Sequence, residues 1–239
     1  LQSTDHGTSW TIKDRPTEAA FEGVAINASQ VVIGGQHMHW NTAIVLISED
    51  RGDTWRAVDS WPDEGLHMND LLYQDGLFVA PTPYSSENWV TVSSDGKVWN
   101  DVAVSDQLGW TSDTIIHDGS QFILPGTDGA VFTSFDGLNW TQLQTPVRSV
   151  SYTSAAWSGS KLVLAGASMS WCGWFFLWPC DEPFDVPAGI SSTDGSMTWE
   201  LFDIDDNYES SGLAWGNGRF VSVGLKPQFE GAGAIYTAD

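Results

Sequence analysis

Short apolar runs separated by polar turns recur along the whole chain of 239 residues. Each repeating unit starts with an apolar run, continues through a tight turn rich in Gly, Asn or Asp, and returns in a second run. A third run follows after a loop of variable length, for example at residues 43–48 and 130–134. Runs this short, bounded by turn residues and without the 3.6-residue period of a helix, are typical of β-strands. The first runs occupy residues 24–26, 71–73, 115–117, 155–157 and 213–215, and the second runs occupy residues 31–33, 78–80, 122–124, 162–164 and 220–223.

After each third run comes a polar turn that starts with Ser and ends on Trp, which we call the boxed turn. Its five copies occupy residues 3–10, 48–55, 93–99, 134–140 and 192–199. Their aspartates are Asp5, Asp50, Asp95, Asp136 and Asp194, and Asp239 aligns with them. These six aspartates are 45, 45, 41, 58 and 45 residues apart. Strand-rich repeats of this length predict a β-propeller of five four-stranded antiparallel blades, forming a single domain over residues 1–239.

The boxed turn, S-x-D-(x)-G-x-(T)-W, resembles the Asp-box, also called the BNR repeat, of sialidases and other glycoside hydrolases. The resemblance covers the whole chain and implies that the boxes are structural and lie away from the ligand site. A carboxylate can accept N–H groups of its own turn, and glycine can supply a left-handed residue. We expect the tryptophans that end the boxes to pack between blades: Trp10, Trp55, Trp99, Trp140 and Trp199.

The two ends of the chain leave two arrangements open. Residues 1–5 and 235–239 both look like the third strand of a blade. Residues 6–13 can supply the outer strand of the last blade and close a ring of five. Alternatively, the chain is part of a larger propeller. Five complete units with matching ends favour the closed ring.

The passage SMSWCGWFFLWPCDEP, residues 168–183, belongs to an inserted aromatic loop at 167–188. It joins the second and third strands of the fourth unit. In a propeller blade this type of connection shares one face with the blade-to-blade connections, opposite the boxed turns and the hairpins that join the first and second strands. We expect a docking loop on that functional face. The predicted binding residues are Trp171, Trp174, Phe175, Phe176 and Trp178 of the loop, with Trp40, Trp61, Trp89 and Trp110 of other connections; Tyr152 and Tyr208 are assigned to the same face.

The two cysteines of the chain, Cys172 and Cys180, stand at either side of this aromatic passage. They lack the His or Cys partners of a zinc site, so a disulfide is the better interpretation, and a disulfide favours an exported protein. The sequons at Asn27 and Asn139 are compatible with export. Leu1 rather than Met starts the chain, as expected of a trimmed product. The predicted location is extracellular or periplasmic.

Candidate catalytic groups are sparse. A sialidase binds its substrate carboxylate with three arginines. Only Arg15 and Arg148 of this chain can reach the functional face, so we expect the protein to have no sialidase activity. A general glycosidase needs two carboxylates across a cleft. Glu22, Asp70 and Asp113 lie near the starts of inner strands, and Asp70 with Asp113 is the preferred pair.

Metal binding is a weaker interpretation of the remaining polar residues. His37, His39 and His67, and the acidic run 203–206, are interpreted as solvated loop residues rather than ligands. We therefore expect neither a metal nor a cofactor.

The net charge of the chain limits the classes of molecule that it can bind. With 9 basic and 31 acidic residues the net charge is −22, which makes nucleic acid an improbable partner. No apolar run is long enough to span a bilayer, so any membrane contact is peripheral. The sequence favours a non-catalytic extracellular binding propeller whose aromatic loop contacts a protein partner, a larger complex or a glycan. The alternative is a glycoside hydrolase or a carbohydrate-binding domain.

Overall fold

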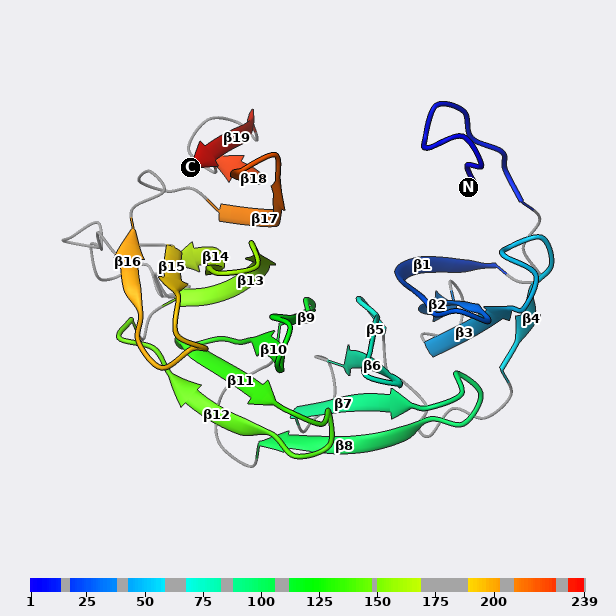
Figure 1. Cartoon of the computed structure of the whole chain (residues 1–239), viewed down its shortest axis with the longest axis horizontal. Helices are drawn as coiled ribbons and strands as arrows, with labels where there is room; N and C mark the ends of the chain where they lie inside the picture. The colour runs from blue at the N-terminus through cyan, green and yellow to red at the C-terminus, as the bar shows by residue number, and fades with distance from the viewer. Residues whose placement is uncertain are drawn as a thin grey trace, which may run out of the picture. The chain divides into compact units, whose positions relative to one another are not determined.

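The computed structural model describes residues 1–13, 18–37, 43–58, 68–82, 88–105, 112–147, 150–168, 189–202, 209–226 and 232–238. Within these ranges the strands form five antiparallel sheets, which are the propeller-like blades that the sequence predicts (Figure 1). The described ranges hold no helix long and apolar enough to cross a membrane.

Each sheet follows chain order from its first strand to its last. The first consists of β1 (Ala19–Ile26), β2 (Val31–His37), β3 (Ala43–Ser48) and β4 (Arg56–Ala57). The second consists of β5 (Leu72–Gln74), β6 (Leu77–Thr82), β7 (Asn88–Ser93) and β8 (Asn100–Ser105). The third consists of β9 (Ile116–His117), β10 (Phe122–Pro125), β11 (Ala130–Ser134) and β12 (Thr141–Gln144). The fourth consists of β13 (Val150–Trp157), β14 (Leu162–Ser168), β15 (Gly189–Ser192) and β16 (Glu200–Phe202), and the last of β17 (Glu209–Gly216), β18 (Arg219–Lys226) and β19 (Ala232–Ala238).

The chain divides into two compact units, Leu1–Ala103 and Val104–Asp239. In the first unit, Ala25 and Val32 of the first sheet share a buried cluster with Leu71, Phe78 and Trp99. In the second unit, an equivalent cluster joins the third and fourth sheets. Its members include Ile123, Val131, Tyr152, Leu164 and Ile190. Packing of sheet faces against one another therefore forms the core inside each unit.

In each of the five boxed turns the aspartate accepts backbone N–H groups of its own turn, as predicted, and these groups belong to residues two to four positions later. In the turn after β3, the Oδ1 atom of Asp50 accepts the backbone N–H of Thr54 at 2.8 Å. The hydroxyl oxygen of Ser48 accepts the N–H of Gly52 at 2.6 Å. Gly52 has a φ of 90°, a left-handed conformation that glycine adopts without strain. The aspartates of the other four turns likewise accept backbone N–H groups of their own turns.

Trp10 is an exception to the expected packing of the box tryptophans. Trp99 is 4% exposed, and Trp55, Trp140 and Trp199 are partly buried, but Trp10 is 60% exposed. Residues 1–13 belong to none of the sheets, and their one bridge joins Gln2 to Thr11. The first boxed turn therefore lacks the neighbouring strands that cover the others.

The last sheet has three strands in the described structure. Thr11 of the first unit pairs with Gln2. Addition of residues 6–13 to the last sheet, and with it closure of a five-bladed ring, stays a prediction.

Replacing the aspartate of one boxed turn is expected to affect stability alone. In Asp95→Ala the N–H groups of Lys97 and Val98 lose the acceptor that now lies 2.8 and 2.9 Å away. Because the turn is exposed and water can replace the carboxylate in part, we expect a loss of about 1–2 kcal/mol in the free energy of unfolding. Urea denaturation measures it. A binding defect at unchanged stability would contradict the structural role.

Candidate functional site

Two side-chain hydrogen bonds identify which turns share an end of the blades. Gln30, in the turn between β1 and β2, donates from its amide to the carbonyl oxygen of Asp95 at 2.9 Å. Gln121, in the turn between β9 and β10, donates to the carbonyl oxygen of Gly195 at 3.2 Å. Each bond links a first hairpin to the boxed turn of the next sheet. The first hairpins and the boxed turns therefore share one end, as predicted, and the other connections leave from the opposite end.

The connection with the aromatic sequence starts at that opposite end. Ser168, at the end of β14, pairs with Val150, and Gly189, at the start of β15, pairs with Ala165. The stem of the loop is thus set by the two strands. The predicted site residues of the loop, with Cys172 and Cys180, lie outside the described residues, as do Trp40, Trp61, Trp110 and Tyr208.

The prediction that Trp89 lies in a loop is wrong. It is the second residue of β7, and its backbone pairs with Thr82 of β6. The apolar run of this strand starts only at Val90, so the sequence pattern placed the start of the strand too late.

The starts of the inner strands carry polar residues at equivalent positions. In β1, β13 and β17 the pairing shifts between Phe21 and Gly23, between Tyr152 and Ser154, and between Ser210 and Gly212. The residue inside each shift is polar and exposed. Aligning the first apolar runs places five residues at this position: Glu22, Asn69, Asp113, Thr153 and Ser211. Four of them are exposed and Asn69 is partly exposed, so this end of the blades presents polar groups to solvent.

The three candidate acids lie at or beside this position, but they belong to both units. Glu22 and Asp70 lie in the first unit, and Asp113 lies in the second. A Cβ atom built on Gly23 would stand 2.8 Å from the carbonyl carbon of Asp70, so β1 and the residues before β5 are closely packed. The structure therefore brings the backbone of β1 next to Glu22 close to Asp70, which lies just before β5. Glu22 and Asp113 are exposed, and the Oδ1 atom of Asp70 accepts the N–H of Leu71 at 2.8 Å.

Hydroxyl groups hold the inner strands of the second unit together at this end. Thr114 donates to the carbonyl oxygen of Thr153 at 3.2 Å, and Thr153 donates to the carbonyl oxygen of Ser210. The hydroxyl oxygens of Ser154 and Ser210 are 2.7 Å apart, and those of Ser210 and Ser222 are 2.9 Å apart. Sequence reasoning missed this network, because Ser and Thr are common in exposed loops and only the packed strands show that three of these serines are buried.

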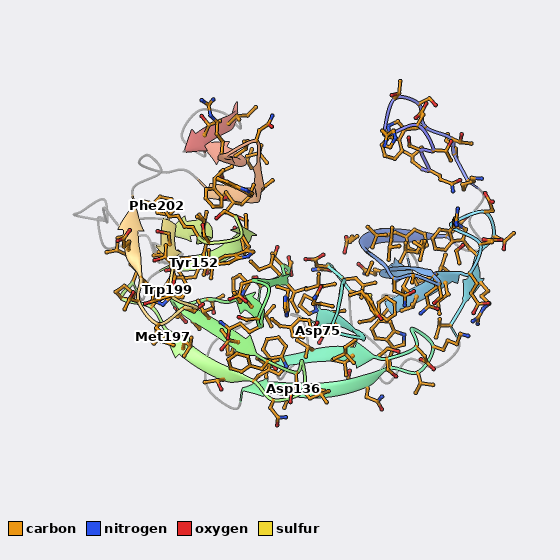
Figure 2. All side chains as sticks on the ribbon, in the orientation of Figure 1. Asp75, Asp136, Tyr152, Met197, Trp199 and Phe202 are labelled. Atoms are coloured by element: carbon orange, nitrogen blue, oxygen red, sulfur yellow. The ribbon has the colours of Figure 1, made fainter. Side chains whose placement is uncertain are left out.

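Tyr152 is a core residue and not part of the functional face, which corrects the sequence analysis (Figure 2). Its side chain is fully buried, and its hydroxyl group lies 3.1 Å from the Oγ1 atom of Thr145. Burial raises the pKa of Tyr152, because the ionised form would lose its hydration. The strand β13 starts five residues earlier than its apolar run, and this extension carries Tyr152 inward.

The boxed aspartates titrate at unusually low pH. Hydrogen bonds lower the pKa of Asp5, Asp50 and Asp194 to about 2. The largest contribution comes from the hydroxyl group four residues later, followed by the N–H of that same residue. Bonds of this kind favour the charged carboxylate. These groups therefore act as permanent acceptors that hold the turns.

Acid should weaken these turns. Since the folded pKa of about 2 is lower than the unfolded value of about 3.9, the stabilisation is complete above about pH 4 and disappears as the pH falls toward 2. We expect the parent to lose stability as the pH falls from about 4 to 2. A double variant, Asp50→Asn with Asp194→Asn, should lose less stability over the same pH range, because it lacks two of the carboxylates that become protonated. The melting temperature from pH 6 to pH 2 measures the difference. Parallel curves for the two proteins would contradict the prediction.

Few of the weaker candidates fall within the described residues. His37 ends β2, whereas His39, His67, the run 203–206, Arg15 and Arg148 lie outside. No group of three or more metal-binding side chains gathers in the part of the chain that the structure describes.

Comparison with known proteins supports the fold. No family model and no curated protein matches the chain. A structure of YCF48 bound to D1 peptide is similar with a TM-score of 0.63 and 17% identity, over 94% of this chain and 64% of that one. The GH74 enzyme of Niastella koreensis has a TM-score of 0.59 and 17% identity, over 85% of this chain and 33% of its own. The GH74 xyloglucanase of Xanthomonas campestris has a TM-score of 0.61 and 13% identity, over 91% of this chain and 36% of its own.

The chain thus spans less than two thirds of the length of each of these three proteins. At these identities the likeness extends to the β-propeller fold and not to a shared activity.

Proposed function

We propose that this chain is a non-catalytic binding propeller that recognises a protein partner through the aromatic connection between β14 and β15. The observation that carries the proposal is the position of the loop stem. Ser168 and Gly189 end their strands away from the boxed turns, at the end where the inner strands present exposed polar residues. A 20-residue connection, 169–188, with three Trp and three Phe starts there.

The chemistry of the loop favours a protein surface over a lipid surface. Trp and Phe provide large contact areas with few torsions to order, and Trp is enriched among residues that dominate binding energy. Acidic residues follow Cys180, namely Asp181, Glu182 and Asp185, and with the net charge of −22 they oppose binding to anionic lipid. Among the similar structures, the one of YCF48 was determined bound to D1 peptide, so a propeller of this kind accommodates a protein segment.

A disulfide between Cys172 and Cys180 would limit the free conformations of the loop, so less entropy would be lost on binding. It also agrees with the proposed extracellular or periplasmic location. Titration of the unreduced, denatured protein with a thiol reagent tests the pairing. Absence of titratable thiol supports it, and two free thiols per chain would refute it.

The decisive experiment compares two double variants. Trp174→Ala with Phe176→Ala alters the loop, whereas Trp10→Ala with Phe135→Ala removes the same residue types from boxed turns, where they are 60% and 77% exposed. Peptides selected from a displayed library on the parent protein serve as probes. We expect the loop variant to bind them at least about tenfold more weakly, the loss typical of one interface hot spot, and the control to bind like the parent. Equal binding by both variants would refute the proposal.

A glycoside hydrolase or carbohydrate-binding domain is the alternative. It is favoured by the close packing of β1, beside Glu22, against the backbone of Asp70 and by the GH74 enzymes among similar folds. Retention on a glycan array, with loss in Glu22→Gln or Asp70→Asn, would support it over protein binding.

Sialidase activity is expected to be absent. A fluorogenic sialoside should remain uncleaved by the purified protein, because the chain provides too few arginines at the functional face for a carboxylate clamp. Turnover that disappears in Arg15→Ala or Arg148→Ala would overturn this expectation.

A further inference from the structure

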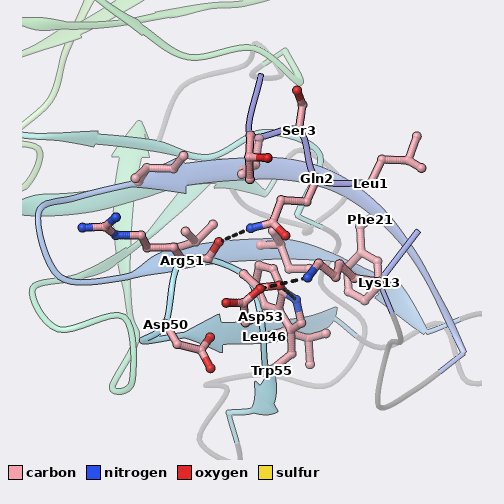
Figure 3. Close-up of a pocket in the computed structure, with 16 residues that line it drawn as sticks. Leu1, Gln2, Ser3, Lys13, Phe21, Leu46, Asp50, Arg51, Asp53 and Trp55 are labelled. Carbon is pink, nitrogen blue, oxygen red and sulfur yellow. Dashed lines mark hydrogen bonds and ion pairs between the residues drawn. The ribbon is translucent and has the colours of Figure 1, made fainter. Parts of the chain in front are cut away.

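The basic side chains that the structure describes gather at one end of the sheets in each unit. We call the end with the first hairpins and the boxed turns the box end, and the opposite end, where Ser168 and Gly189 lie, the loop-bearing end. Lys13, for example, lies 2.8 Å from Asp53 of a boxed turn (Figure 3). Every Lys and Arg whose side chain the structure describes lies at the box end: Lys13, Arg51, Arg56, Lys97, Lys161 and Arg219.

Acidic residues occupy the loop-bearing end of the second unit. Asp113 precedes β9, Asp128 lies in the turn between β10 and β11, and both are exposed. Neither carboxylate forms a hydrogen bond or an ion pair with a residue in the described ranges. At the box end, by contrast, the Oδ1 atom of Asp118 accepts the N–H groups of Ser120 and Gln121. Asp118 thus holds its own turn, whereas Asp113 and Asp128 are open to a partner.

The turn with Asp128 is held beside the base of the aromatic connection. The N–H of Gly129 donates to the carbonyl oxygen of Val150 at 2.9 Å, and Val150 pairs with Ser168, after which the connection begins. The amide of Gln144 donates to the carbonyl oxygen of Asp128 at 2.9 Å. These bonds fix the backbone of Asp128 next to the loop stem.

Asp113 is attached to the same part of the second unit through both of its neighbours. The N–H of Ser112 donates to the carbonyl oxygen of Pro125 at 2.8 Å, directly before the turn with Asp128. The hydroxyl group of Thr114 donates to the carbonyl oxygen of Thr153 at 3.2 Å. The backbone position of Asp113 is therefore set by contacts inside the second unit alone.

The sequences of the connections that leave from the loop-bearing ends add further acids. The connections 59–67, 169–188 and 203–208 each contain three acidic residues and no Lys or Arg. Three basic residues belong to connections or strand ends on this side, namely Arg15, Arg148 and Lys226. Acidic residues therefore outnumber basic ones on the side of the aromatic connection.

We propose that the protein partner is recognised through a basic segment, in which Arg or Lys stands beside apolar side chains. The inference rests on the proposed binding role of the aromatic connection. A guanidinium group stacks on a Trp ring and also donates two hydrogen bonds to a carboxylate, so Trp and open acids favour the same partner side chain. In a chain of charge −22, open carboxylates also repel one another, and a cationic segment relieves this repulsion.

Asp113→Asn with Asp128→Asn tests the two acids without changing the size of either side chain. Asp128 has a φ of 54°, a left-handed conformation that Asn also tolerates, so the variant should fold, and thermal unfolding verifies this. Asp75→Asn with Glu200→Gln is the matched control. It changes the net charge equally, both residues are exposed at the box end, and Asp75 also has a φ of 54°.

The peptides selected from the displayed library on the parent protein are the probes, and fluorescence anisotropy at low and high salt is the measurement. We expect these peptides to be enriched in Arg and Lys relative to the library. The Asp113 and Asp128 variant should bind them about threefold to tenfold more weakly at low salt, as expected for two partly exposed ion pairs. The difference should shrink at about 1 M salt, where charges are screened over about 3 Å. The control should bind like the parent.

A change in the peptide provides the other half of the comparison. When the Arg and Lys residues of a selected peptide are replaced by Gln, the parent and the Asp113 and Asp128 variant should bind it equally. Such a cycle isolates the interaction between the two sets of charges. A difference in affinity that survives in the Gln peptide would contradict the inference.

The outcomes separate this inference from the proposed function. If Trp174→Ala with Phe176→Ala weakens binding while the Asp113 and Asp128 variant binds like the parent, the aromatic connection needs no basic segment and only this inference fails. If the acid variant alone weakens binding, the basic segment stands and the role of the aromatic connection fails. Equal weakening in the box-end control would assign the effect to total charge, and selected peptides without enrichment of Arg or Lys would also refute the inference.

Discussion

Tyr152→Ala is expected to lower the free energy of unfolding by about 3–5 kcal/mol, the range for removing a large aromatic side chain from a core. The side chain is fully buried among Ile123 and Val131 of the third sheet and Leu164 and Ile190 of the fourth. Its removal opens a cavity between two sheets, which rigid strands can fill only in part. Urea denaturation followed by tryptophan fluorescence measures the loss.

Tyr152→Phe separates packing from hydrogen bonding. The ring is retained, and the Thr145 hydroxyl group still donates to the carbonyl oxygen of Val147 at 3.0 Å. We expect this variant to lose about 1 kcal/mol, the net contribution of one hydrogen bond. If the alanine variant were as stable as the phenylalanine variant, Tyr152 would not be the core residue that the structure describes.

Gly166→Ala is expected to destabilise the protein by about 1–3 kcal/mol, the usual cost of overpacking. This is the opposite of the usual effect, because alanine is normally more favourable than glycine inside a strand. A Cβ atom at this position would overlap the carbonyl oxygen of Ser151. Gly166 pairs with Tyr152 directly before the register shift in β13. The main chain is closest there, and backbone atoms cannot move aside as a flexible side chain can.

The same arrangement recurs in the chain, which provides the comparison. Gly35 pairs with Phe21 before the shift in β1, and a Cβ atom there would overlap the carbonyl oxygen of Ala20. Gly35→Ala should therefore behave like Gly166→Ala. Gly216→Ala is the matched control, since nothing lies within 4 Å of its added Cβ atom. A Gly166→Ala protein as stable as this control would show that the strand pair can open without cost.

These glycines matter for the proposed function because they permit the bulges that turn Glu22 and Thr153 toward solvent at the loop-bearing end. Equivalent bulges are common next to functional sites in other sheet proteins, where they redirect a side chain. Loss of a bulge would change which side chains this end presents, besides its effect on stability.

Local features of this protein could be predicted from the sequence by itself. The third strands 43–48 and 130–134 match the structure at both ends, because alternation and bounding turns act within a few residues. Gly52, Gly76 and Gly137 are left-handed as expected, since a tight turn needs them and few other residues tolerate that conformation. The hydrogen bonds of the boxed turns were predictable for the same reason.

Only the tertiary structure shows which side chains are buried and which distant residues are in contact, because both depend on how neighbouring sheets pack. Trp10 and Trp99 occupy the same position of the same motif, yet one is exposed and the other buried, because burial depends on the strands that adjoin each turn. Tyr152 resembled a loop aromatic until the extended β13 placed it between two sheets. The buried bonds among Ser154, Ser210 and Ser222 join residues up to 56 positions apart, a proximity that no local pattern encodes and that arises only when the sheets pack.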